Sequence, residues 1–266
     1  MLPLAANSWF CRAALRDTVI DAASFTSIRL VSGALMLWLL VTLSRNARAG
    51  AGNWPSALAL FGYAALFSFA YLSLTAATGA LLLFGAVQVT MIGLGLWRGE
   101  RLDGMQALGV ALAFGGLVGL LLPGLSAPPL AGALLMIGAG VSWGIYSVRG
   151  KGAGDPTRVT AGNFIRTVPI TAVLSLALLS DASLDPTGVG YAIASGALTS
   201  ALGYVLWYTV VPTISSTSAA TVQLSVPVIV AIGGVVLLAE PVTLRLLLAS
   251  AAVLGGIGLV ILRKAG

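Results

Sequence analysis

The chain alternates long apolar runs with short polar or proline-containing stretches. A helix needs about 20 apolar residues to cross the ~30 Å hydrocarbon core of a bilayer. The runs cover residues 2–15, 22–43, 54–75, 78–97, 104–122, 130–148, 159–179, 187–211, 214–238 and 242–262. The pattern therefore predicts an all-α membrane protein with ten transmembrane helices.

The first run is shorter than the others and carries Arg12, with Arg16 just beyond it. At 1.5 Å per residue it would cover only about 21 Å. Two explanations are open: the end of this helix reaches a wet cavity with both arginines, or further residues precede Met1. The second explanation is the expectation.

The second half of the chain repeats the first at an offset of about 140 residues. The matches are Glu100 with Glu240, Gly115-Gly116 with Gly255-Gly256, Arg29 with Arg166, and Trp9 with Trp143. Each half holds five runs, and an odd number of crossings turns the second copy upside down relative to the first. The sequence thus predicts two inverted five-helix repeats, 1–122 and 130–266, in a single membrane domain. Close helix packing is expected at the glycine pairs.

Composition supports a membrane protein and excludes several other classes. The chain is 58% apolar and 8% charged, with a mean hydropathy of +1.02, whereas soluble proteins carry roughly 25% charged residues. The net charge of +6 does not indicate nucleic-acid binding, because the Lys and Arg residues lie at the ends of runs. A single cysteine, Cys11, and the absence of His exclude an internal disulfide and a cysteine metal cluster. No cofactor or metal is expected.

The distribution of Lys and Arg predicts the orientation in the membrane. One side of the predicted bundle carries nine of them: Arg45, Arg48, Arg98, Arg101, Arg149, Lys151, Arg158, Arg263 and Lys264. The other side carries two, Arg16 and Arg245. Positive residues collect on the cytoplasmic side. We therefore expect a multi-pass protein with both termini in the cytoplasm and the linker 123–129 in the periplasm.

Several segments resemble a known family. The stretch 141–149 resembles the sixth span of EamA-type transporters of the drug/metabolite transporter superfamily. Pro227-Val228-Ile229, Gly233-Gly234 and the segment 237–243 resemble its ninth span and the following turn. The resemblance covers essentially the whole chain. It implies a ten-helix exporter of amino acids, aromatic ones included, and similar small metabolites in a bacterial inner membrane. Val87 departs from the repeat, because it stands where Pro227 stands in the second half.

Polar and aromatic side chains within the runs are the candidates for a solute path. A buried amide must face protein or a water-filled cavity, although it can also simply join helices. Aromatic residues can likewise form an interfacial belt instead of lining a cavity. The predicted substrate-binding residues are Asn7, Tyr71, Gln88, Trp143, Tyr146, Tyr204, Tyr208 and Gln223. Pro227 is the predicted hinge.

The roles of two arginines within the runs stay open. Arg29 and Arg166 lie about two turns inside their helices, where a bare guanidinium is costly. Each can reach the nearest interface, project into the solute path or hold backbone carbonyls.

Glu100 and Glu240 precede the last run of each half. They are expected to complement the dipole of the helix that follows, with Asp103 and Thr243 as caps. A role in transport is not the expectation for either carboxylate.

The sequence thus predicts a transporter that works by alternating access, not an enzyme. No Asp, Glu or His lies in the middle of a run, so transport is expected to be uncoupled from a proton gradient. The alternatives are a membrane-embedded lipid-modifying enzyme and a proton-coupled drug exporter. The expected partners are a small solute and the lipid bilayer, with no nucleic acid. The oligomeric state is open, and a monomer is compatible with the sequence.

Overall fold

The computed structural model describes residues 1–43, 50–97, 99, 101–124, 127–150, 154–210 and 216–263, without the side chains of 208, 216–222, 262 and 263. All regular secondary structure in these ranges is helical. The helices are α1 (Leu2–Asp17), α2 (Ala22–Leu43), α3 (Trp54–Tyr71), α4 (Ala76–Trp97), α5 (Gly104–Leu121), α6 (Leu130–Gly150), α7 (Pro156–Ala177), α8 (Pro186–Ile193), α9 (Gly203–Val210), α10 (Ser216–Leu238) and α11 (Leu244–Arg263). A short 3₁₀ turn, η1 (Leu179–Asp181), follows α7, and a π-helical segment, η2 (Ala194–Leu202), joins α8 to α9.

Most of these helices have the length and composition of membrane spans. In the described residues, eight segments are long and apolar enough to cross a bilayer, and α8, η2 and α9 together make one of them, Pro186–Trp207. Helix α1 has only 16 residues, and the apolar part of α10, Gln223–Leu238, is also short. The prediction of an all-α membrane protein is confirmed.

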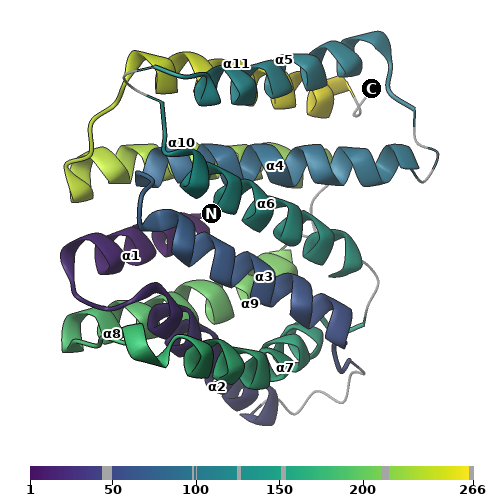
Figure 1. Cartoon of the computed structure of the whole chain (residues 1–266). Helices are drawn as coiled ribbons and strands as arrows, with labels where there is room; N and C mark the ends of the chain where they lie inside the picture. Colours follow the sequence, from purple (N-terminus) through teal and green to yellow (C-terminus); the bar gives the residue numbers. More distant parts are fainter. Residues whose placement is uncertain are drawn as a thin grey trace.

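The helices lie in layers that run roughly parallel to one another (Figure 1). Helices α5 and α11 pack against each other at the top of the view, above α4 and α10, which also pack together. Helices α1, α3 and α6 form the middle of the molecule, and α2, α7, α8 and α9 lie at the bottom. The middle layer touches both neighbours, because α6 packs on α3 and α4 while α1 packs on η2 and α10. Residues of the middle layer are therefore in position to line a central site.

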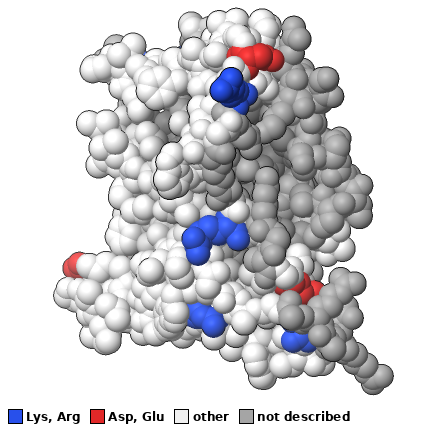
Figure 2. Space-filling view, turned by 90° about the vertical axis from the view of Figure 1, so that its right-hand side faces the viewer, with Lys and Arg blue, Asp and Glu red and all other residues white. Residues whose placement is uncertain are grey.

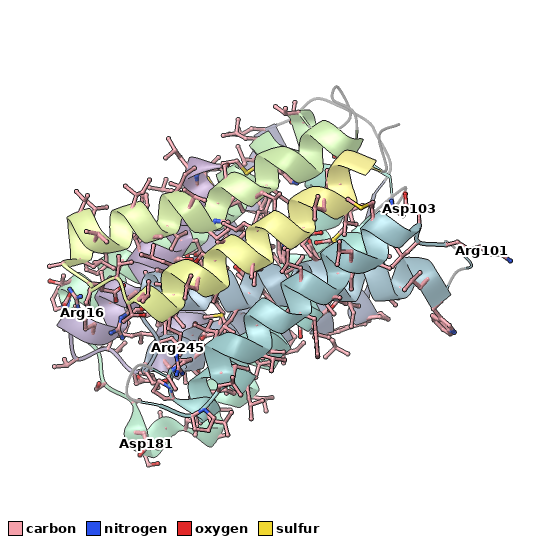
Figure 3. The ribbon with its side chains drawn as sticks, turned by 90° about the horizontal axis from the view of Figure 1, so that it is seen from above. Arg16, Arg101, Asp103, Asp181 and Arg245 are labelled. Carbon is pink, nitrogen blue, oxygen red and sulfur yellow. The ribbon has the colours of Figure 1, made fainter. Side chains whose placement is uncertain are left out.

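Polar residues mark the two ends of the bundle. Arg16, Asp181 and Arg245 lie at one end and Arg101 and Asp103 at the other (Figure 3). We call the first the Asp181 end, which includes the turns 18–21, 72–75 and 239–243. The second is the Arg101 end, which includes residues 99, 101–103 and 154–155. The view of Figure 2 shows separate blue and red positions on a mostly uncharged surface, as a bilayer requires.

Close packing of α5 on α11 depends on glycine. A Cβ atom at Gly109 would lie 2.5 Å from the carbonyl oxygen of Gly256, and one at Gly256 would collide with the carbonyl oxygen of Gly109. Gly116 faces α11 in the same way, whereas Gly115 and Gly255 face open space. One glycine of each predicted pair therefore provides the close contact.

Polar side chains cap the helices where they begin. Asp103 and Gln106 form a reciprocal capping box at the start of α5, and Thr243 accepts a hydrogen bond from Leu246 N–H at the start of α11. Both predicted caps are confirmed. Asp185 caps α8, and the hydrogen bond from Gly188 N–H holds the pKa of its carboxyl below the ordinary value.

Candidate functional site

A buried amide joins three helices at the centre of the molecule. Asn7 of α1 donates from Nδ2 to the Tyr63 hydroxyl of α3 at 3.1 Å. Its Oδ1 accepts from Ser195 Oγ of η2 at 2.6 Å and from Thr199 Oγ1 at 3.4 Å. Tyr63 lies near the middle of α3, so this network lies at mid-depth in the bundle. The amide is satisfied by neighbours from both halves of the chain.

Arg29 of α2 lies against this network and does not reach an interface. Its side chain is 1% exposed. Nη2 donates to the Tyr63 hydroxyl at 3.2 Å, and Nε donates to Ser200 Oγ at 3.4 Å. The guanidinium carbon lies 5.2 Å and 5.1 Å from the ring centres of Tyr63 and Phe67. Within the described part of the chain, Nη1 has no hydrogen-bond partner.

The π-helical segment η2 supplies the polar side of this site. π-helical turns are rare and often occur at functional sites. Here the turn lets Ser195 and Thr199 face Asn7 while Ser200 faces Arg29. Gly196 permits the contact, because a Cβ there would collide with the Arg29 carbonyl oxygen. Helix α2 and η2 therefore approach closely beside the arginine.

Aromatic rings close the other side of the site. The ring centres of Trp143 and Tyr63 are 4.8 Å apart, and those of Trp143 and Tyr204 are 5.0 Å apart. Tyr146 follows at 5.4 Å from Trp143. We use the term central cluster for Asn7, Arg29, Tyr63, Trp143, Ser195, Ser200 and Tyr204. All seven side chains are buried, and they come from five helical elements and η2.

The structure brings together only part of the predicted site. Asn7, Trp143 and Tyr204 belong to the central cluster, and Tyr146 adjoins it. Tyr71 lies about two turns beyond Tyr63 on α3, where its ring packs on Phe67 at 4.7 Å.

The remaining predicted residues lie elsewhere or outside the description. Gln88 is buried on α4 and Gln223 half-buried on α10, and no hydrogen bond among the described groups ties either amide to the cluster. Pro227 lies inside α10. The side chain of Tyr208 lies outside the described residues, as does Glu100.

The two matched arginines have different environments. Arg166 Nη1 donates to the carbonyl oxygens of Ala51 at 2.5 Å and Gly162 at 2.8 Å, near the Arg101 end. Arg166 therefore holds backbone carbonyls, one of the three roles left open by the sequence. Arg29 instead contacts side chains at the centre.

A buried ion pair ties several elements together at the Asp181 end. Arg12 Nε donates to Glu240 Oε1 at 2.9 Å, and Arg12 Nη1 donates to the Tyr71 carbonyl at 2.9 Å. Glu240 Oε2 accepts from Ala76 N–H at 2.7 Å. The expectation that Glu240 complements the dipole of α11, the helix it precedes, is wrong. Its carboxylate instead accepts the hydrogen bond from the first residue of α4, Ala76.

The turn after α10 explains this position. Ala239 has a φ of 50°, in the left-handed region that favours glycine. The Glu240 N–H returns to the Gly234 carbonyl at 3.0 Å. Glu240 is therefore directed back over the bundle and is 7% exposed.

A separate polar network closes the Arg101 end. Arg149 Nε donates to Ser56 Oγ at 3.2 Å, and Asn163 Oδ1 accepts from Asn53 N–H at 2.9 Å. Asn163 Nδ2 also donates to the Tyr146 hydroxyl at 3.4 Å. A cavity of about 20 Å³ lies among these side chains, about the space of one water molecule.

Sequence reasoning missed residues whose partners are distant in the chain. The sequence does carry a signal for some of them: Tyr63, Phe67 and Tyr71 follow one another at a spacing of four, and Ser195, Thr199 and Ser200 recur at helical spacing. No local signal pairs Arg12 with Glu240, which are 228 positions apart.

Comparison with known proteins identifies the family. Residues 130–262 match the EamA-like transporter family. The chain belongs to this family. An uncharacterized protein of Pseudomonas aeruginosa is 55% identical over 100% of this chain and 93% of its own length. An uncharacterized transporter of Archaeoglobus fulgidus is 29% identical over 87% of this chain and 84% of its own length.

A solved crystal structure supports the fold of this EamA-like chain. It has a TM-score of 0.66 and 19% identity, and it covers 99% of this chain and 95% of that one. The family indicates a multi-pass membrane transporter rather than an enzyme.

Proposed function

We propose that this EamA-like transporter exports amino acids, aromatic ones included, and similar small metabolites across the bacterial inner membrane. The observation that carries the proposal is the central cluster, in which buried polar groups and stacked aromatic rings from both halves meet at mid-depth. Sites for small molecules combine aromatic walls with a few placed polar groups. The resemblance of the sequence to the amino-acid exporter YddG supports the same solute class.

The packing of the helices supports two inverted repeats of five crossings each. Exchanging the halves replaces α1 by α6, α2 by α7, α3 by the α8–η2–α9 segment, α4 by α10 and α5 by α11. Under this exchange the contact of α3 with α6 becomes that of η2 with α1, and the contact of α4 with α6 becomes that of α10 with α1. The contacts α2 with α7, α4 with α10 and α5 with α11 map onto themselves. Such pseudo-symmetry is common in secondary transporters, whose sites lie between the repeats.

Alternating access requires a separable contact at each end of the site. We infer that the Arg12–Glu240 pair is the contact at the Asp181 end, because it joins α1 to the turns before α4 and after α10. The contacts of Arg149 and Asn163 with the start of α3 serve the same purpose at the Arg101 end. The excess of Lys and Arg residues at the Arg101 end supports a cytoplasmic position for that end.

We infer that transport follows the solute gradient. Each acidic residue that the structure describes lies in a turn or at a helix end, and the sequence has no His. Glu240 is buried but paired with Arg12. Arginine cannot take up and release a proton during transport, because its guanidinium stays protonated at physiological pH.

Purified protein in proteoliposomes tests the proposal. Uptake of a panel of labelled amino acids should exceed that of protein-free liposomes, and collapsing a pH gradient should leave the final level unchanged. Uptake of no member of the panel would disprove the amino-acid assignment. Accumulation above equilibrium that needs the pH gradient would disprove uncoupled transport.

A further inference from the structure

The positive charge of Arg29 has no counter-ion in the described part of the chain. The ion pairs found there are Arg12 with Glu240 and Arg16 with Asp17, both at the Asp181 end. Arg29 is 1% exposed at the centre of the bundle, and an isolated buried charge is unfavourable there. The centre of the bundle thus holds a charge that a ligand of opposite sign can neutralise.

The guanidinium is also oriented with one donor group free. Nε and Nη2 are engaged by Ser200 and Tyr63, and the rings of Tyr63 and Phe67 lie beside the guanidinium plane. Nη1 is buried without a hydrogen-bond partner among the described groups. The planar guanidinium matches carboxylate geometry, and fixing two of its nitrogens reduces the entropy lost when the third binds a ligand.

We propose that Arg29 binds the carboxylate of the transported solute through Nη1. The proposal rests on the proposed transport function and narrows it to solutes that carry a carboxylate. The rings of Trp143 and Tyr204, which pack on each other at 5.0 Å, would provide the cation–π contact for the ammonium group of an amino acid. An organic cation without a carboxylate is repelled by Arg29, so this site does not suit a cationic drug.

Matched pairs of small molecules test the assignment. The probes are 3-phenylpropionate against 3-phenylpropionamide and phenylalanine against phenylalaninamide, with affinity measured from the thermal stability of purified protein. The acid of each pair should bind roughly 10–100-fold more tightly than the amide, because a hydrogen bond between two charged groups exceeds one to a neutral group by that factor. Arg29→Gln should remove the difference. Arg166→Gln, at the matched position in the other half, should keep it.

A purely structural role for Arg29 predicts other results. If the arginine only held helices together, Arg29→Gln would lower the melting temperature of the ligand-free protein. Because the charge is uncompensated, we expect that temperature to stay equal or rise. If this variant fails to fold, the ratio of acid affinity to amide affinity in the wild-type protein still tests the carboxylate site.

Equal binding of acid and amide by the wild type, or an acid preference retained in Arg29→Gln, overturns the proposal. The transport function can fail separately. Labelled amino acids that do not cross proteoliposomes, while the carboxylates still bind preferentially through Arg29, would refute the amino-acid function and support the carboxylate site. If amino acids and their amides cross equally well, that result would support the transport function and refute the carboxylate site at Arg29.

Discussion

Removing the charge of Glu240 should open the Asp181 end of the transporter. The substitution Glu240→Gln keeps the shape of the side chain and an oxygen that can accept the hydrogen bond from Ala76 N–H. It removes the negative charge that faces Arg12 Nε at 2.9 Å. The arginine is then left beside the bundle core with only the Tyr71 carbonyl as partner.

The expected effect follows from the burial of the pair. The side chains of Arg12 and Glu240 are 13% and 6% exposed. Breaking a buried ion pair by removing one partner costs about 3–5 kcal/mol, and we take about 3 kcal/mol because Arg12 keeps some solvent and one hydrogen bond. The pair joins elements that separate in the proposed alternating-access mechanism, so this cost would fall on the closed state. The ratio of open to closed molecules should rise by about 100-fold.

The single cysteine of the chain reports this opening. Cys11 precedes Arg12 on α1 and is fully buried. In the closed state a thiol reagent reaches it slowly, and its rate of modification follows the open fraction. The rate in detergent or proteoliposomes should therefore be about 100-fold higher in Glu240→Gln than in the wild type.

The exposed ion pair on the same helix provides the control. Arg16 and Asp17 are 32% and 47% exposed, and such surface pairs contribute about 0–1 kcal/mol. Asp17→Asn should change the rate of Cys11 modification little. A rate in Glu240→Gln that equals those of the wild type and of Asp17→Asn would refute the assignment of Glu240 to a gate.

Three further predictions test the centre, the packing and the orientation. Asn7→Ala leaves the hydroxyls of Tyr63 and Ser195 without their amide partner, so transport should fall and the protein should lose about 1–3 kcal/mol of stability, measured by thermal melting. Gly196→Ala should destabilise by about 1–3 kcal/mol or more through its collision with the α2 backbone, whereas Gly190→Ala, which meets open space, should melt like the wild type. If the Asp181 end is periplasmic, an impermeant thiol reagent added to intact cells should label Asp181→Cys and not Arg101→Cys, and the reverse pattern contradicts the orientation.

The sequence was sufficient for the helical framework and the family. Runs of about 20 apolar residues permit little other than membrane helices, because backbone groups in lipid must be satisfied within the chain. The caps at Asp103 and Thr243 could also be predicted, because a capping residue and the helix that it begins are adjacent in the sequence. Three of the seven residues of the central cluster were predicted for a related reason: a buried amide such as Asn7 or an aromatic residue such as Trp143 is conspicuous in an apolar run.

Tertiary structure alone decided the partners of these residues. Arg29 and Arg166 occupy matching positions in the two halves of the sequence, yet one contacts the central cluster and the other holds the Ala51 carbonyl. Glu240 reads as the start of its own helix, but the left-handed turn at Ala239 directs it to Arg12 and to the start of α4. Local sequence determines which residues a helix contains and how its ends are capped. The partner of a buried charge such as Arg12 or Arg166 can lie more than a hundred residues away in the chain. Only the packing of the helices determines that partner.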